Sequence, residues 1–270
     1  MLFSVFCFRT SMIQLNYLLI SQYINHNITN SIFISFQIFQ NVNMTNYIPL
    51  VTTIVALTFT ILLFWQLVNR RKIHQAIWTI AMALFAIAAL MEYLANPNIL
   101  GPSATLIKIY YVSAAPLVGL LGSGVLYLLV RRKIAHIYLG IVIILTLVLL
   151  VGGTSTDLSE EAITKAFQLN LPEAFREAIG LFPFVTARLP SILLNITGGI
   201  LLIGGALFSF IIDMRKTYNI PLILGGLFPS LGGFLLGIMG NADIFFEFEL
   251  AGTVFLFLGF VMSIKYLARN

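Results

Sequence analysis

One stretch decides the fold class: MTNYIPLVTTIVALTFTILLFW, from Met44 to Trp65. From Ile48 onward no charged residue interrupts the run until the cluster Arg70, Arg71 and Lys72. A helix needs about 20 mainly apolar residues to cross the hydrocarbon core of a bilayer, so this run is long enough to span a membrane. Similar runs, separated by short charged or Pro- and Gly-containing segments, recur along the chain. The sequence therefore predicts an all-α integral membrane protein.

Composition excludes a soluble domain. Of the 270 residues, 59% are hydrophobic and 9% are charged, whereas soluble domains contain about 25% charged residues. The formal net charge of +5 does not indicate a nucleic-acid partner, because membrane proteins collect Lys and Arg on one side of the bilayer. Cys7 is the only cysteine, which excludes an intrachain disulfide and a thiolate metal cluster. We expect the lipid bilayer as a partner, no nucleic acid, no cofactor and no metal.

Seven spans are predicted, in residues 48–68, 75–95, 104–130, 134–153, 190–212, 220–240 and 246–267. Residues 44–270 are therefore expected to form a seven-helix bundle. In residues 1–43, polar side chains interrupt every apolar run, and the features of a signal peptide are missing. We interpret residues 1–43 as a poorly ordered or non-native extension, with translation starting at Met44. An extra, weakly hydrophobic helix is the alternative.

The distribution of charge favours one orientation. Basic residues gather at alternate ends of the spans and acidic residues gather at the opposite ends. By the positive-inside rule, Met44 lies outside and the C-terminus is cytoplasmic in a multi-pass protein of the plasma membrane. The basic residues assigned to the cytoplasmic side are Arg70, Arg71, Lys72, Arg131, Arg132, Lys133, Arg215, Lys216, Lys265 and Arg269. The acidic residues assigned to the outer side are Glu92, Asp157, Glu160, Glu161, Glu173, Glu177, Asp243, Glu247 and Glu249.

The segment 154–189 is the longest connection between predicted spans. It begins with a capping-box pattern, Asp157 to Glu160, and its apolar residues repeat at helical spacing on both sides of Pro172. We predict two short amphipathic helices that lie on the outer leaflet or cover the bundle. A plain lid over helix ends is the preferred interpretation, and a ligand-gated lid is the alternative.

Small residues at four-residue spacing indicate helix contact faces. In lipid, helices associate through close approach of their backbones, which small side chains permit. Pro116 and Pro229 each remove a backbone hydrogen bond and are expected to shape their helices. Whether the contact faces meet sister helices or a second protomer stays open. The predicted packing residues are Gly119, Ser123, Gly225, Gly233 and Gly237.

Motifs of enzymes and cofactor proteins are missing from the sequence. It contains neither a phosphate-binding G-x-x-x-x-G-K-[ST] loop nor an H-E-x-x-H zinc pair. The last span has no lysine near its middle to form a Schiff base with retinal, since Lys265 lies at its end. His74 and His136 could ligate a haem iron at one membrane depth, but we interpret them as interfacial residues. We therefore expect a protein that is not an enzyme.

Ionisable residues near the outer ends of the spans form the candidate site. Glu92 and Lys108 lie at similar depth on antiparallel neighbours, where pairing would reduce the cost of burying either charge. The preferred interpretation is an ion pair that fixes helix packing, with Glu247 and Glu249 solvated. The alternative is a small outward-facing pocket for a polar or charged ligand. Its predicted lining is Glu92, Lys108, Tyr111, Arg188, Asn195, Glu247 and Glu249.

Three stretches carry a resemblance to a family. WTIAMALFAIAALMEY (Trp78–Tyr93), KIYY (Lys108–Tyr111) and AGTVFLFLGF (Ala251–Phe260) resemble stretches of uncharacterised prokaryotic seven-helix membrane proteins. More distantly, the layout is similar to the seven-helix sensor modules at the N-termini of some bacterial histidine kinases. The resemblance implies a seven-helix fold in a prokaryotic membrane, with Met44 to Arg269 covered. A kinase or other output domain is not expected after Arg269, which departs from the sensor layout.

Two hypotheses about function remain. The first is a non-enzymatic sensor-like module or accessory subunit, with a membrane-protein partner or a second copy of the chain as its partner. The second is a transporter of a small solute or ion. No acid or base stands in the middle of any predicted span, although a proton relay would need such stations. The halves of the chain also show no obvious repeat of the kind on which many transporters are built. Both observations favour the first hypothesis.

Overall fold

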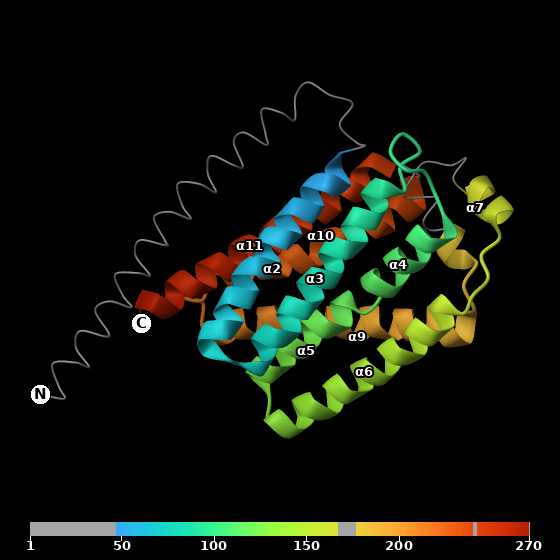
Figure 1. The fold of residues 1–270 in the computed structure, drawn as a ribbon. Helices are drawn as coiled ribbons and strands as arrows, with labels where there is room; N and C mark the ends of the chain where they lie inside the picture. The colour runs from blue at the N-terminus through green and yellow to red at the C-terminus, as the bar shows by residue number, and fades with distance from the viewer. Residues whose placement is uncertain (1–46, 167–176, 240–241, 270) are drawn as a thin grey trace, which may run out of the picture. The chain divides into compact units, whose positions relative to one another are not determined.

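The computed structural model describes residues 47–166, 177–239 and 242–269, and this part of the chain is helical without any strand. The interpretation of residues 1–43 as an extension or an extra helix lies outside the described residues. Figure 1 shows the helices in chain order. They are α2 (Ile48–Arg70), α3 (Ile73–Leu94), α4 (Ala104–Ala114), α5 (Leu117–Leu129), α6 (Arg132–Thr154), α7 (Glu160–Ala166), the π-helix η2 (Phe184–Arg188), α9 (Leu189–Ile212), α10 (Asn219–Met239) and α11 (Ala242–Arg269).

Six helical segments are long and apolar enough to cross a membrane, so the protein has the architecture of a multi-pass membrane protein. Each predicted span overlaps a helix of the structure. The seventh, 220–240, falls on α10, whose apolar stretch as described, Asn219–Gly232, is shorter than a full span. The count of seven spans therefore stays a prediction. The six segments are Ile48–Arg70, Ile73–Leu94, Ala104–Leu129, Arg132–Thr154, Phe184–Ile212 and Ile244–Ile264.

Local chemistry explains the ends of the first helices. Arg71 ends α2 in the left-handed conformation, with φ of 49°, and its N–H donates to Leu67 O at 2.7 Å. Gly101, with φ of 80°, stands in the turn between α3 and α4, where a residue with a Cβ would be strained. The Ser103 hydroxyl then accepts a hydrogen bond from the N–H of Leu106 and caps α4.

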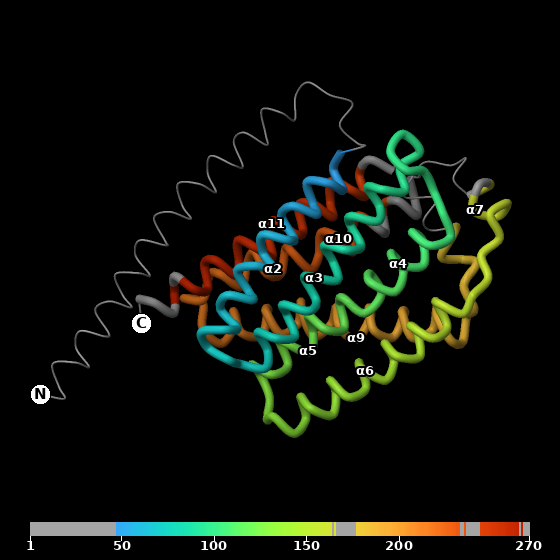
Figure 2. The backbone as a smooth tube through the Cα atoms, in the orientation of Figure 1, coloured from blue at the N-terminus to red at the C-terminus, as the bar shows by residue number. Residues whose placement is uncertain are grey.

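One span is interrupted by proline. Pro116 separates α4 from α5, and the backbone continues from one helix into the next (Figure 2). The pyrrolidine ring has no N–H to donate and clashes with the preceding turn, so a helix breaks or bends at this point. This confirms the expectation that Pro116 shapes its span. Pro229, in contrast, lies inside the continuous helix α10.

Neighbouring helices form a closed circuit. Around it α11 contacts α2, α2 contacts α3, α3 contacts α4 and α5, α5 contacts α9, α9 contacts α10, and α10 contacts α11 (Figure 1). The helix α6 packs outside this circuit, against α4, α5, α9 and η2. Only 17% of the apolar window of α6 is buried, compared with 61% for α4 and α5 together. The large apolar face of α6 is therefore left for lipid or for another protein.

The segment 154–189 packs onto the bundle. Leu158, Ile163, Ala178 and Phe182 are buried in a cluster with residues of α4, α6 and α9. The predicted capping box at Asp157 is wrong, because the hydroxyl of Ser159 caps α7 by accepting a hydrogen bond from Ala162 N at 3.2 Å. The part of the second predicted amphipathic helix that falls in residues 167–176 lies outside the described residues.

Close contact between glycines joins α5 to α9. A Cβ added at Gly122 would lie 2.7 Å from Gly198 O, and one added at Gly119 would lie 2.9 Å from a methyl carbon of Leu194. The hydroxyl of Ser123 is buried and donates to Gly119 O at 2.8 Å. The structure thus places Gly119 against a sister helix, whereas the packing role of Ser123 stays a prediction. It also adds Gly198, whose role the four-residue pattern did not indicate.

A second close contact joins α10 to α11. A Cβ added at Gly225 would lie 2.7 Å from Leu256 N, and one added at Gly252 would lie 2.5 Å from Pro229. Gly225 therefore lies against a sister helix. The surroundings of Gly233 and Gly237 lie outside the described residues, so their predicted packing role stays a prediction.

Candidate functional site

The two ends of the bundle differ in charge. We call the end at which α2 and α4 begin and α3 and α6 end the acidic end, and the opposite one the basic end. At the acidic end, several polar side chains are buried instead of facing solvent. They are Thr52, Thr53, Glu92, Asn96, Glu249 and Thr253. Charged side chains are almost never fully buried unless they are paired, so the two glutamates identify this layer as the candidate site.

Glu92 and Glu249 form a buried carboxyl pair. Their exposed fractions are 2% and 8%, and their side chains lie close enough to interact electrostatically. The hydroxyl of Tyr110 lies near Glu92. Glu92 and Tyr110 come from the consecutive helices α3 and α4, whereas Glu249 comes from α11, which is far from both in the sequence. We call Glu92, Glu249 and Tyr110 the carboxyl cluster.

Several atoms in this layer have no hydrogen-bond partner in the structure. They are Oε2 of Glu92, Oε2 of Glu249, Oγ1 of Thr52 and Nδ2 of Asn96. The hydroxyls of Thr53 and Thr253, in contrast, donate to the backbone oxygens of Pro49 and Glu249 at 2.8 Å. A buried polar atom without a partner costs about 1–3 kcal/mol, and such atoms are rare in native proteins. The layer therefore carries a set of polar groups that a ligand could complete.

Thr52 belongs to the same layer as Glu249. Phe59 of α2 packs against Phe257 and Phe260 of α11, with ring centroids 5.5 Å and 5.1 Å apart. Both helices run from the acidic to the basic end (Figure 1). Thr52 precedes Phe59 by seven residues and so lies on the same face of α2, two turns nearer the acidic end. On α11, Glu249 precedes Phe257 by eight residues and Thr253 precedes Phe260 by seven. Both therefore also lie about two turns nearer the acidic end than these phenylalanines.

Asn96 belongs to the layer through α3. It follows Glu92 by four residues and so lies on the same side of the chain, one turn nearer the acidic end. Asn96 organises the turn after α3, because its Oδ1 accepts from Asn98 N at 2.9 Å and its backbone oxygen accepts from Ile99 and Gly101. Its Nδ2 is buried and has no hydrogen-bond partner in the structure.

The structure separates Lys108 from Glu92. Lys108 Nζ donates to Thr154 O at 3.1 Å and so stabilises the end of α6. Among the described residues, no ion pair joins Glu92 to this lysine, so the predicted packing pair is wrong. The reason is helical phase. Residues two apart on a helix point in nearly opposite directions, so that Tyr110 faces Glu92 while Lys108 faces α6.

The same phase argument separates Glu247 from Glu249 on α11. Glu247 is exposed, whereas Glu249 is buried. The prediction that both are solvated therefore holds for Glu247 and is wrong for Glu249. Depth along the helix could be estimated from the sequence, but the direction of each side chain could not.

The remaining predicted residues lie near η2 and the start of α9. Tyr111 is buried and stacks on Phe182, with ring centroids 4.3 Å apart. Its hydroxyl lies near Ser191 and Arg188, and the Arg188 guanidinium lies 5.9 Å from the Phe184 ring centroid. Asn195 is exposed, and its Nδ2 donates to Ser191 O at 2.9 Å. No described ion pair joins Arg188 to the carboxyl cluster, so the predicted pocket is divided into two groups.

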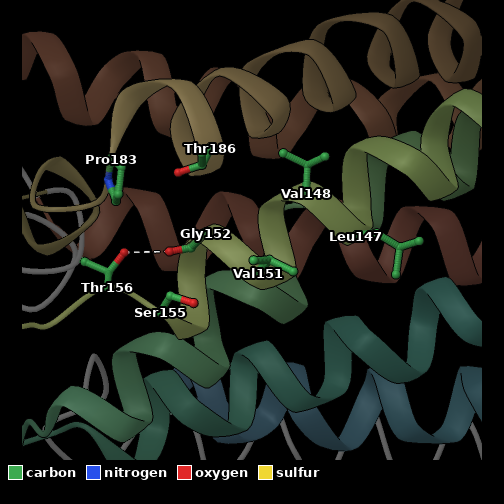
Figure 3. Close-up of a pocket in the computed structure, with 8 residues that line it drawn as sticks. All are labelled: Leu147, Val148, Val151, Gly152, Ser155, Thr156, Pro183 and Thr186. Carbon is green, nitrogen blue, oxygen red and sulfur yellow. Dashed lines mark hydrogen bonds between the residues drawn. The ribbon is translucent and has the colours of Figure 1, made fainter.

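An apolar groove of about 510 Å³ lies between α6 and η2 (Figure 3). Val151 and Leu147 line it from α6, and Pro183 and Thr186 line it from the opposite side. The hydroxyl of Thr156 donates to Gly152 O at 2.6 Å, as the dashed line in Figure 3 shows. Its eight lining residues include no titratable side chain, and its polar side chains are the hydroxyls of Ser155, Thr156 and Thr186.

His74 and His136 lie with aromatic residues near the basic end. His136 is hydrogen-bonded through Nδ1 to the hydroxyl of Tyr127, and the His74 ring lies edge-on to Trp78 at 5.5 Å. Within the described part of the chain, no three His, Cys, Asp or Glu side chains gather as metal ligands.

The sequence indicated only part of the candidate site. Glu92 and Glu249 were among the predicted pocket residues, whereas Tyr110 of the carboxyl cluster and the nearby polar residues Thr52 and Asn96 were not. The four-residue spacing between Glu92 and Asn96 is the signal that could have found Asn96. In comparisons with protein-family models, with curated proteins and with solved structures, the chain has no match.

Proposed function

We propose that this protein is a non-enzymatic, seven-span sensor-like module or accessory subunit of a membrane complex. Its small outward-facing polar site is centred on Glu92 and Glu249. The observation that carries the proposal is the buried carboxyl pair, surrounded by polar atoms without partners, near one end of the bundle. Burial makes such a pair costly, and intramembrane ionisable residues are functional-site candidates for that reason.

The distribution of charge supports an outward-facing site in the plasma membrane. Basic clusters such as Arg70–Lys72 and Arg131–Lys133 lie at the basic end, which the positive-inside rule assigns to the cytoplasm. The carboxyl cluster lies toward the other end. A ligand from outside would reach it past the turn between α3 and α4, where Asn96 is placed. The unpartnered carboxylate oxygens would coordinate a small cation or accept a hydrogen bond from a donor.

An aromatic cluster supports sensing over transport. Phe59, Phe257 and Phe260 are buried and contact one another directly below the site, on the side toward the basic end. They close the interface between α2 and α11 with apolar rings, so a ligand bound at the carboxyl pair has no polar route onward along this interface.

Transport of a small solute or ion is the second candidate. It is favoured by the spacing of Thr52, Phe59 and Gln66, which follow one another at seven-residue intervals on the buried face of α2. Gln66 and Gln75 are buried in the half of the bundle toward the basic end, and Oε1 of Gln75 has no partner. Polar groups thus lie on both sides of the aromatic rings, as in a path with a closed gate.

The proposal is tested by ligand-induced stabilisation of the full chain in detergent or nanodiscs. Alkali cations, small amines and amino acids serve as probes, and the thermal midpoint is measured. A ligand at a hundredfold excess over its Kd stabilises by about 2.7 kcal/mol. We expect this stabilisation in the wild type and in Glu247→Gln, the exposed control, but not in Glu249→Gln. Stabilisation that persists unchanged in Glu249→Gln would contradict the site.

The two candidate functions are separated by counterflow in proteoliposomes, with the stabilising solute as the labelled probe. A sensor-like module binds this solute without moving it across the bilayer. Counterflow that is abolished by Glu92→Gln would instead establish the transporter.

A further inference from the structure

We infer that the start of α6 binds an anionic phospholipid at the basic end of the bundle. The phosphate of the headgroup lies against Arg131, Arg132 and Lys133, and an acyl chain lies along the exposed apolar face of α6. This surface lies toward the opposite end of the bundle from the carboxyl cluster. The inference therefore goes beyond the proposed function and does not depend on it.

The turn between α5 and α6 is an exposed cationic surface. Arg131, Arg132 and Lys133 are consecutive in the sequence, and all three side chains are exposed. Among the described residues, no carboxylate forms an ion pair with them, and the first turn of α6 contains no acidic residue. Asp213, the acidic residue that the sequence assigns to this end, has its Oδ2 3.8 Å from Lys216 Nζ. The three positive charges of the turn are therefore available to an anion in the headgroup layer.

A second basic turn, Arg70–Lys72, lies at the same depth. The indole of Trp78 on α3 lies against Gly124 of α5, since an added Cβ at this glycine would meet Nε1 of the indole. Lys72 precedes Trp78 by six residues, and Arg131 follows Gly124 by seven. At about 1.5 Å per residue, both turns lie about 10 Å from this contact toward the basic end. Their charges therefore act on one layer of headgroups, and basic clusters of this kind beside a span attract anionic lipids.

An exposed apolar stripe on α6 begins at the cationic turn. Residues at alternating spacings of three and four lie on one face of a helix, and Lys133 precedes the second residue of the stripe by four positions. One leaflet contributes half of the hydrocarbon core of about 30 Å, which corresponds to about ten residues of helix. The stripe covers this length, so it matches one acyl chain below a headgroup at the turn. Its residues, with exposed fractions between 49% and 66%, are Ile134, Ile137, Ile141 and Ile144.

Two side-chain contacts turn this stripe away from the bundle. Nδ1 of His136 is hydrogen-bonded to the hydroxyl of Tyr127 on α5. The hydroxyl of Tyr138 is hydrogen-bonded to Oγ1 of Thr197 on α9 at 2.9 Å. His136 and Tyr138 flank Ile137 in the sequence, so these contacts hold both sides of α6 against its neighbours and leave Ile137 on the outer side.

Charge favours a lipid over a second copy of the chain on this face. Two copies inserted in the same orientation would place their cationic turns at the same depth. A symmetric contact through α6 would then bring Arg131, Arg132 and Lys133 of both copies together, and like charges at an interface disfavour association. An anionic phospholipid brings the opposite charge to the turn and an apolar chain to the stripe.

Photoreactive lipids test this inference on the full chain. Nanodiscs contain equal parts of phosphatidylglycerol, which is anionic, and phosphatidylcholine, which is zwitterionic. In parallel samples one of the two lipids carries a diazirine on its acyl chain, and peptide mass spectrometry locates the adducts. One basic residue near an anionic membrane surface contributes about a fivefold preference, so phosphatidylglycerol adducts between Ile134 and Ile144 should exceed those of phosphatidylcholine by at least about this factor. Equal adducts of the two lipids would overturn the inference.

Matched variants remove three positive charges from either end of the bundle. The triple variant Arg131→Gln, Arg132→Gln and Lys133→Gln should bring the adduct ratio close to one. The control changes the same net charge at the acidic end and should keep the ratio of the wild type. Survival of the preference in the first variant, or its loss in both, would contradict the assignment. The control combines Lys108→Gln, Lys165→Gln and Arg188→Gln.

Two measurements keep the inference falsifiable if the triple variant fails to insert or fold. In the wild type, salt at about 1 M shortens the Debye length to about 3 Å and should lower the adduct ratio; a ratio that is indifferent to salt would overturn the inference. In a Cys7→Ser background, Ile137→Cys in lipid vesicles should remain monomeric when treated with a bifunctional maleimide. Efficient crosslinking of two chains would place a second copy on the stripe and exclude the lipid.

Discussion

At the residue scale, helical phase decides which ionisable groups are buried. Glu249 and Glu247 are two residues apart, yet one is buried and the other is exposed. Tyr110 and Lys108 divide in the same way between α3 and α6. Because successive residues are rotated by about 100° on an α-helix, a difference of two positions is enough to change a buried partner into a surface group.

Tyr218 offers a pH-dependent property outside the spans. Burial raises the pKa of Tyr218, and the neighbouring Tyr266 and Asp213 raise it further. The folded chain therefore holds this proton more tightly than the unfolded chain, whose tyrosine has a pKa of about 10. The free energy of unfolding consequently falls as the pH rises from about 10 toward the raised pKa. Tyr218→Phe should remove part of this alkaline loss of stability.

The measurement is an alkaline titration of phenolate absorbance, with the Tyr218→Phe curve subtracted from that of the wild type. The difference curve should lie above the usual range for tyrosine. Asp213→Asn, which removes a nearby negative charge, should lower it. A difference curve at the ordinary tyrosine pKa would show that the side chain is solvated.

At the element scale, the α5–α9 contact depends on the absence of side chains. A Cβ added at Gly198 would lie 2.3 Å from Val118 O, whereas one added at Gly204, also on α9, would meet nothing within 4 Å. Overpacking costs about 1–3 kcal/mol, and alanine favours a helix over glycine by about 1 kcal/mol. We therefore expect Gly198→Ala to destabilise the protein and Gly204→Ala to leave it unchanged or slightly more stable.

Thermal unfolding in the same nanodiscs compares the two variants. Equal midpoints for Gly198→Ala and Gly204→Ala would mean that α5 and α9 do not approach each other as closely as the glycine pair indicates.

The elements were largely predictable from the sequence, whereas the contacts between them were not. Apolar runs, the basic clusters and Pro116 place the helices and the break between α4 and α5, because these signals are local. The pairing of Glu92 with Glu249 depends on the rotation of α3 and α11 and on their being neighbours through tertiary packing. Neither the rotation of these helices nor their being neighbours can be read from a single segment of the sequence. Depth alone suggested Lys108 as the partner and was misleading for that reason.

At the scale of the whole molecule, the circuit of helices brings the first and last described spans together. The contact between α2 and α11 closes it, and Phe59 seals this contact against Phe257 and Phe260. The carboxyl cluster lies next to the closure, and the turn between α3 and α4 lies at the same end of the bundle. The orientation of the bundle in the membrane therefore determines which compartment supplies the ligand.

Cysteine accessibility in intact cells tests the proposed orientation. In a Cys7→Ser background, Asn98→Cys in the turn after α3 should react with a membrane-impermeant maleimide added from outside. Arg71→Cys, in the turn after α2, should react only after the membrane is permeabilised. The reverse pattern would place the acidic end in the cytoplasm and turn the proposed site inward.

The carboxyl pair formed by Glu92 and Glu249 also has a consequence for biosynthesis. Glu92 enters the membrane with α3, but Glu249 is made only after the described helices α4, α5, α6, α7, η2, α9 and α10 have been synthesised. Until α11 inserts, the nascent chain exposes an unpaired carboxyl group within an incomplete bundle, a state that membrane quality control can recognise. The carboxyl pair therefore also marks completed assembly, since a chain that stops before α11 cannot form it.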